Sequence, residues 1–210
     1  MGDPAQGAGG GQRRPAHGAD QGLGVRGSVR GSRKLLGWLS LSPRVDLQQN
    51  WYDRDRTGKE LPARFTYSTA VSARTTIYGT FFPGALGVQA ARHIVEPSAS
   101  FSWAPDFPQY FTESGSDRFF SFGGLGSTPR ERESLSLSLV NKLQVKTGSG
   151  ENVRRLDNLL RVSNSTSYNF LNDERPWSDL STSVEVRPGT PLSLRWNARH
   201  DAYDGSIQSS

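Results

Sequence analysis

The sequence predicts an all-β fold, an antiparallel transmembrane β-barrel segment of about seven strands with a disordered N-terminal tail. Most of the chain alternates apolar and polar residues with a period of two, which indicates strands with two chemically different faces. Only 34% of the residues are hydrophobic and the mean hydropathy is -0.59, so a large soluble core is not expected. No apolar run approaches the roughly 20 residues that a membrane helix needs. A barrel wall has this low mean hydropathy because its lipid-facing and water-facing residues alternate.

Residues 1–34 are predicted to be a disordered tail, because they are rich in Gly, Gln, Ala and Arg and show no apolar periodicity. Six Arg and Lys residues and two Asp residues give the tail +4 of the net charge of +5. The rest of the chain is nearly neutral, so the basic pI does not indicate a nucleic-acid partner. The tail lacks the apolar stretch of a signal peptide, and we therefore expect a truncated or misassigned N-terminus.

Three glycines of the tail match the dinucleotide-binding pattern G-x-G-x-x-G. They are Gly22, Gly24 and Gly27. That pattern binds a dinucleotide only where a strand leads into it and a helix follows, and neither is predicted here. We interpret the match as accidental.

Residues 35–210 are predicted to be the partial barrel domain. Its strands are expected within 39–50, 65–81, 93–103, 134–146, 160–170, 179–187 and 192–199. The clearest has leucines at 135, 137, 139 and 143 opposite serines at 134, 136 and 138; a helix would scatter these leucines around its circumference. Most segments reach the 9 to 11 residues, roughly, that a tilted strand needs to cross a bilayer, whereas strands of soluble sandwiches run to about five or six.

Turn residues separate the predicted strands, so consecutive strands are expected to pair antiparallel. The turns are expected at 55–58, 83–84, 148–150 and 187–190. Residues 105–130 are too long for a turn and are interpreted as an extended loop on the long-loop side of the wall. Aromatic residues collect toward the strand ends, where they suit the headgroup zone: Trp38, Trp51, Tyr52, Phe81, Phe82, Trp103, Tyr110, Trp177 and Tyr203.

Seven basic residues fall on the polar face and are candidates for contact with anions or with phosphate groups: Arg44, Arg74, Lys142, Lys146, Arg161, Arg195 and Arg199. The alternative is a solvated lumen in which Asp46, Glu96, Asp179 and Glu185 balance them. No catalytic, cofactor or metal site is predicted. Cysteine is absent and the three histidines have no metal-ligand spacing. The acidic turn from Asp53 to Gly58 has Arg64 where a calcium loop needs a bidentate Glu.

A run of short motifs resembles the barrel region of LptD-type lipopolysaccharide-assembly proteins. The most specific is R-H-x-x-x-P-S followed by P-D-F, carried here by Arg92, His93, Pro97, Pro105, Asp106 and Phe107. Further matches begin at Val140, Arg155, Ser167 and Trp177, in the family's order. The resemblance covers roughly residues 35–204, and the family's jellyroll domain and cysteines have no counterpart.

This resemblance implies a partial chain of an outer-membrane barrel that inserts lipopolysaccharide into the outer leaflet, without covalent chemistry and without a cofactor. It also implies periplasmic bridge proteins and a plug lipoprotein as partners, beside lipopolysaccharide and the bilayer of the cell outer membrane. Two alternatives stay open: a passive porin or receptor-type barrel, and a soluble β-rich binding domain.

Overall fold

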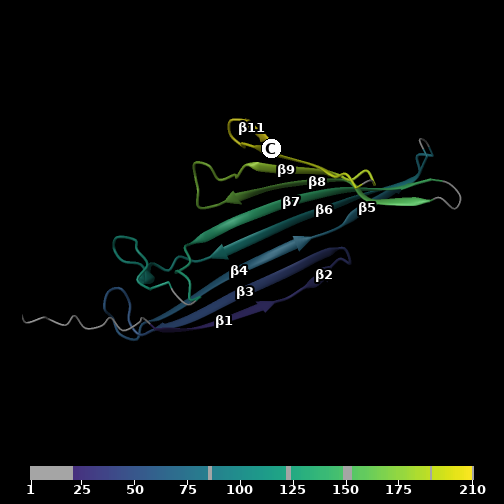
Figure 1. Ribbon diagram of the computed structural model, residues 1–210. Coiled ribbons are helices and arrows are strands. Elements are labelled where there is room, and N and C mark those ends of the chain that lie inside the picture. The colour runs from purple at the N-terminus through teal and green to yellow at the C-terminus, as the bar shows by residue number, and fades with distance from the viewer. Residues whose placement is uncertain (1–20, 85–86, 122–123, 149–152, 190, 210) are drawn as a thin grey trace, which may run out of the picture.

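A computed structural model of the chain describes residues 21–84, 87–121, 124–148, 153–189 and 191–209. Within these ranges, eleven strands form a single antiparallel sheet (Figure 1). The one helical element there is a 3-10 turn, η1 (Pro108–Tyr110). In the described part of the chain, no helix is long and apolar enough to cross a membrane. The predicted all-β antiparallel fold is therefore confirmed.

The strands follow one another along the chain and pair mostly with their sequence neighbours. They are β1 (Gly22–Arg30), β2 (Arg33–Leu35), β3 (Leu39–Tyr52), β4 (Ala63–Arg74), β5 (Ile77–Phe81), β6 (Val88–Ala104), β7 (Arg132–Thr147), β8 (Arg154–Asn169), β9 (Leu180–Val186), β10 (Leu194–His200) and β11 (Ile207–Ser209). The order across the sheet is β1-β3-β4-β6-β7-β8-β9-β10-β11, with β2 beside β3 and β5 beside β6. The sheet is open, so closure into a barrel stays a prediction.

The predicted count of about seven strands is wrong, because the described residues form eleven. Each of the seven expected segments is present. The second is divided into β4 and β5, and the break between these two strands lies opposite Pro97 of β6. The Pro97 carbonyl accepts from the Thr75 N–H at 3.2 Å. Because proline has no backbone N–H, Pro97 cannot donate a hydrogen bond to the neighbouring strand. The ladder of backbone hydrogen bonds is therefore interrupted at this point.

The predicted disorder through residue 34 is also wrong where the structure describes the tail. Residues 22–30 form β1 and pair with β3 from Gly22↔Tyr52 to Arg30↔Arg44. The alternation that the glycines conceal is real, since Leu23, Val25 and Val29 share one face. Residues 1–20 lie outside the described ranges, and the division of the chain into two domains at residue 34 stays a prediction.

The three glycines of the dinucleotide-type pattern lie inside β1, where no helix follows. A local steric reason explains why glycine occupies position 24. A Cβ at this position would lie 2.8 Å from Asn50 Oδ1 and 2.5 Å from Leu125 Cδ2, so the missing side chain leaves room for the loop that packs there.

The two ends of the sheet carry connections of unequal length. At one end the strands are joined by residues 53–62, 105–131, 170–179 and 201–206. At the other end, the connections span 36–38, 82–87, 148–153 and 187–193. The only cluster of buried hydrophobic residues in the described chain, Tyr52, Phe119 and Leu125 with Tyr110 packed against it, joins the long 105–131 connection to β3. No second sheet and no helical layer packs against this sheet in the described residues, and the strands form one curved wall (Figure 1).

Candidate functional site: a wall with an apolar and a polar face

One face of the wall exposes large hydrophobic side chains along its whole width. The register places Val71, Phe101, Leu135 and Tyr168 in one row across four strands. The exposed fraction is 54% for Val25 in β1 and 58% for Leu194 in β10, at the two sides of the wall. A soluble monomer rarely exposes a continuous apolar surface of this extent. The face is suited to contact with hydrocarbon.

Aromatic rings form a belt on this face near the long-connection end. Tyr67 lies 6.0 Å from Trp103 between ring centroids, and Phe101 lies 6.0 Å from Phe170. Tyr168 continues the belt to Trp177 at 5.0 Å. These rings come from β4, β6, β8 and the segment before β9. Amphipathic rings gather at the headgroup level of outer-membrane barrels, and the belt has that arrangement.

The apolar band has the height of a bilayer core. Along β3 it runs from Leu39 to Trp51, which at about 3.3 Å per residue and a tilt of about 40° spans roughly 30 Å along a membrane normal. A hydrocarbon core is about 30 Å thick.

The structure places all seven basic candidates on the opposite, polar face, because each alternates with the apolar residues of its own strand and the register aligns these positions across the sheet. Four have acidic partners: Arg44 with Asp46 at 2.6 Å, Lys142 with Glu96 at 2.8 Å, Arg195 with Glu185 at 3.4 Å and Arg199 with Asp179 at 3.9 Å. Arg74, Lys146 and Arg161 form no ion pair within the described residues. Contact of any of the seven with lipopolysaccharide stays a prediction.

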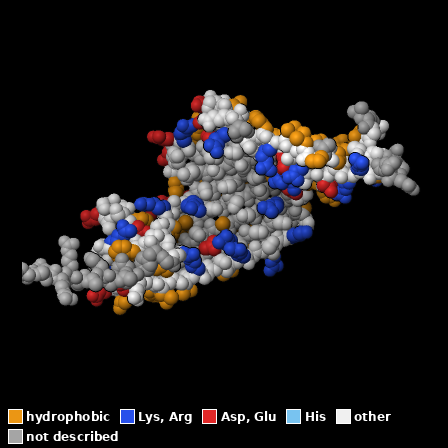
Figure 2. Space-filling view, in the orientation of Figure 1, with side chains coloured by type: hydrophobic (Ala, Val, Ile, Leu, Met, Phe, Trp, Pro, Cys, Tyr) orange, Lys and Arg blue, Asp and Glu red, His pale blue; other side chains and the backbone are white. Residues whose placement is uncertain are grey.

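Serines fill the middle of the polar face. One row reads Ser42, Ser72, Ser100, Ser136, Ser167 across β3, β4, β6, β7 and β8. The next row reads Ser40, Arg74, Ser98, Ser138, Ser165, Ser181. These small side chains leave a hollow of about 630 Å³. Figure 2 shows it as a mostly white depression with blue basic side chains around it.

The family-motif residues lie in β6 and just after it. The Arg92 guanidinium faces the Tyr78 ring at 5.6 Å, and His93 is within 3.2 Å of Asn141 Oδ1. The Asp106 carboxylate accepts from the Phe107 N–H at 2.8 Å. Phe107 is buried between Tyr67 and Tyr110, with both ring centroids at 5.9 Å. Pro105, at the end of β6, begins the connection. The P-D-F element thus turns the chain into the 105–131 loop and fixes the loop to the aromatic belt.

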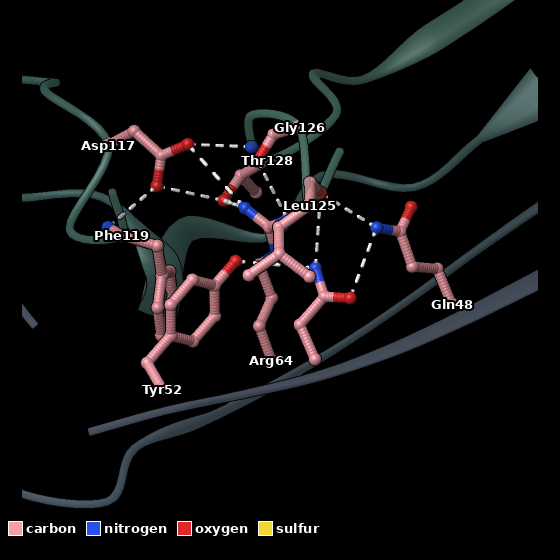
Figure 3. Close-up of polar contacts among 9 residues, drawn as sticks. Gln48, Tyr52, Arg64, Asp117, Phe119, Leu125, Gly126 and Thr128 are labelled. Carbon is pink, nitrogen blue, oxygen red and sulfur yellow. Dashed lines mark hydrogen bonds and ion pairs between the residues drawn. The ribbon is translucent and has the colours of Figure 1, made fainter. Parts of the chain in front are cut away.

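The 105–131 loop folds back onto the polar face, where Arg64 of β4 holds it (Figure 3). Arg64 is buried and donates to the carbonyls of Leu125 and Gly126 at 2.9 and 3.0 Å and to Thr128 Oγ1 at 3.1 Å. Its guanidinium also lies 3.7 Å from the Asp117 carboxylate. The rings of Tyr52 and Phe119 face the same cation at 5.6 and 5.4 Å.

Three further hydrogen bonds fasten the loop to neighbouring strands. Gln48 and Asn50 of β3 donate to the Leu125 carbonyl at 2.8 and 3.2 Å, and Arg26 of β1 donates to the Gly124 carbonyl. The loop therefore covers the polar face of β1, β3 and β4 at the long-connection end. The sequence prediction of an extended loop missed this anchor. The one signal of the anchor in the sequence was Arg64 itself, an arginine beside aromatic residues at an even-numbered position, which belongs to the polar face.

The turn after β3 carries a second anchor for the same loop. The buried Asp55 carboxylate accepts from Thr57 Oγ1 at 2.6 Å, from the Lys59 N–H at 3.0 Å and from Arg118 at 2.8 Å. Burial by itself raises the pKa of Asp55, but these hydrogen bonds outweigh it and hold the pKa below the ordinary value of 3.8. The acidic turn is a loop clamp in the structure.

Asp55→Asn is expected to destabilise the chain by an amount that depends on pH. Because the pKa of Asp55 is lower in the folded state, the stabilisation is fully present above about pH 4 and is lost as the pH falls through the folded-state pKa. Urea unfolding followed by tryptophan fluorescence at pH 7, 5 and 3 should show the difference from wild type shrinking toward pH 3. Asp157→Asn, which removes an exposed pair with Arg155, is the control and should have little effect. A difference independent of pH would contradict the clamp.

Comparison with known families decides the identity of this two-faced wall. The family model described as LptD protein matches residues 13–203. The chain belongs to the LptD protein family. The match begins within the segment predicted to be a disordered tail and includes β1 and β2, in agreement with their place in the sheet. Searches among curated proteins and among solved structures find no match for the chain.

Proposed function

We propose that this chain forms part of the wall of an outer-membrane barrel that inserts lipopolysaccharide into the outer leaflet. The observation that carries the proposal is the single-layer wall itself, in which an apolar face with an aromatic belt backs directly onto a serine-lined polar face. Lipopolysaccharide has the same division into acyl chains and a hydrophilic saccharide. Because the chain belongs to the LptD family, lipopolysaccharide is the molecule that we propose it transports.

In this proposal the apolar face contacts the hydrocarbon of the outer membrane and the polar face lines a hydrated lumen. The long connections, including 53–62 and 105–131, face the cell exterior, because outer-membrane barrels carry short turns on the periplasmic side and longer loops outside. Further strands pair with the open edges, since an unpaired edge in lipid is very costly. Transport changes no covalent bond of the cargo, so the protein acts as a transporter and not as an enzyme.

Depletion of the protein from the cells that make it tests the proposal. Newly made lipopolysaccharide is expected to accumulate away from the cell surface, as measured by surface labelling of intact cells after a pulse of labelled sugar. The protein itself should fractionate with the outer membrane. Normal delivery of lipopolysaccharide after depletion would contradict the proposal, and a loss confined to the uptake of small solutes would favour a passive porin.

A further inference from the structure

We propose that the serine-lined hollow of the polar face is a binding site for a phosphorylated sugar, with Arg74 as the partner of the phosphate group. The inference rests on the proposed function, which supplies lipopolysaccharide as the ligand. It adds the part of the polar face that the phosphorylated saccharide contacts. Three features carry it: the hydroxyl lining, the unpaired cation and the placement of the surrounding charges.

Twelve of the seventeen residues that line the hollow are serine or threonine. The charged side chains in it are Arg74 and Asp179, at opposite sides. Ser72 and Ser100 approach each other to 2.9 Å, while Ser98, Ser136 and Ser138 have no side-chain hydrogen bond in the described part of the chain. Each serine hydroxyl can donate one hydrogen bond and accept two. A surface of this kind exchanges hydrogen bonds with a sugar and does not repel a charged substituent.

Arg74 differs from the other basic residues of the polar face by its surroundings. It lies in register with Ser40 on one side and Ser98 on the other. It is exposed, and its side chain forms no hydrogen bond or ion pair among the described residues. The nearest acid along β6 on this face is Glu96, which Lys142 already engages at 2.8 Å. The guanidinium is therefore available to an external anion.

The other two of the seven candidates that form no ion pair lie in more crowded places. Arg161 is in register with Glu185, which also contacts Arg187 at 2.7 Å and Arg195 at 3.4 Å. Lys146 is in register with Arg155, whose partner is Asp157 at 2.8 Å. Neither lines the hollow. Arg74 alone combines a free guanidinium with a hydroxyl lining in the described chain.

The distribution of charge around the hollow favours one orientation of the ligand. Lys34 of β2 lies in register with Ser40, and this row therefore has two cations on the β2 to β4 side. On the far side, Asp179 is 3.9 Å from Arg199. A guanidinium binds phosphate through paired N–H donors, and serine hydroxyls add further donors. The phosphate is thus held at Arg74 while the sugar lies over the serines of β6 and β7.

Photocrosslinking with the full chain in outer-membrane preparations tests this site. A photoreactive residue replaces Ser138, which lines the hollow, and the probes are purified lipopolysaccharide and glucose 6-phosphate, each compared with its dephosphorylated form. We expect Arg74→Gln to lower the yield with both phosphorylated probes by about tenfold, the effect of losing a charge-assisted hydrogen bond. Lys146→Gln, the matched control, should change the yield little. Dephosphorylation should reproduce the loss in the wild-type chain.

The two probes separate this inference from the proposed function. Lipopolysaccharide capture that is independent of Arg74 and of phosphate would overturn the site and leave the proposed function standing. Capture of glucose 6-phosphate through Arg74 without capture of lipopolysaccharide would support the site and reject the cargo. Arg74→Lys retains the charge and loses the paired donors, so it should restore part of the yield. Heat-modifiable migration on gels shows that each variant is folded.

Discussion

Arg64→Ala is expected to release the 105–131 loop from the polar face and to lower the free energy of unfolding by about 3–5 kcal/mol, the range for removing one partner of a buried charged network. The substitution removes the donor to the Gly126 carbonyl, one of the three donors to the Leu125 carbonyl, and the ion pair with the Asp117 carboxylate. It also removes the cation that the Tyr52 and Phe119 rings both face. Urea unfolding measures the loss of stability. Trypsin applied to intact cells measures the release, because cleavage after Arg118 and Arg130 requires a detached loop.

Arg44→Ala is the matched control for this prediction. Arg44 lies on the same face in the neighbouring strand, but its pair with Asp46 is exposed and is expected to contribute at most about 1 kcal/mol. Arg64→Lys keeps the charge but cannot reach two carbonyls and a hydroxyl at once, so an intermediate loss is expected. Trypsin resistance equal to wild type in Arg64→Ala would show that the loop is held by other contacts.

Leu139→Arg is expected to prevent or strongly impair insertion of the wall into a membrane. Leu139 lies on the apolar face near the middle of β7. An arginine on the lipid face near the bilayer midplane costs about 2–4 kcal/mol in an outer-membrane barrel. The equilibrium constant for folding into lipid vesicles, read from heat-modifiable migration, should fall by roughly 30-fold or more, since about 1.4 kcal/mol corresponds to a factor of ten.

The neighbouring residue supplies a control that differs only in the face it occupies. Ser138 is next to Leu139 in β7 but lies on the polar face, where a hydrated lumen tolerates charge. Ser138→Arg should therefore insert nearly as well as wild type. Equal losses for the two variants would contradict the assignment of the apolar face to lipid, and equal tolerance would point to a water-exposed sheet.

Local alternation predicted much of this wall because a period of two is a property of each strand alone. Leucines and serines alternate along β7 so regularly that parity assigns every side chain to a face. The same parity placed Arg44, Arg74 and Arg195 together on the polar face before any pairing was known. Alternation does not reveal β1 in the sequence. Gly22, Gly24 and Gly27 occupy three of its nine positions, and the remaining apolar residues are too few for the strand to be recognised.

Contacts between distant parts of the chain could not be predicted in this way. The Arg64 anchor joins β4 to Asp117, Leu125 and Thr128, which lie far along the chain, and no local pattern relates them. The Asp55 clamp similarly depends on Arg118. Such pairs form because the 105–131 loop folds back over the sheet, which is a consequence of burying Phe119 and Leu125 against Tyr52.

For the strands with regular alternation, the amino-acid order alone determines where the strand lies and which face each side chain occupies, because successive residues of a strand point to opposite sides. Tertiary structure decides which charges neutralise one another. Lys142 meets Glu96 and Arg199 meets Asp179 only through the register between strands, while the same register surrounds Arg74 with serines. Register is a relation between segments, set by hydrogen bonding and side-chain packing across the sheet.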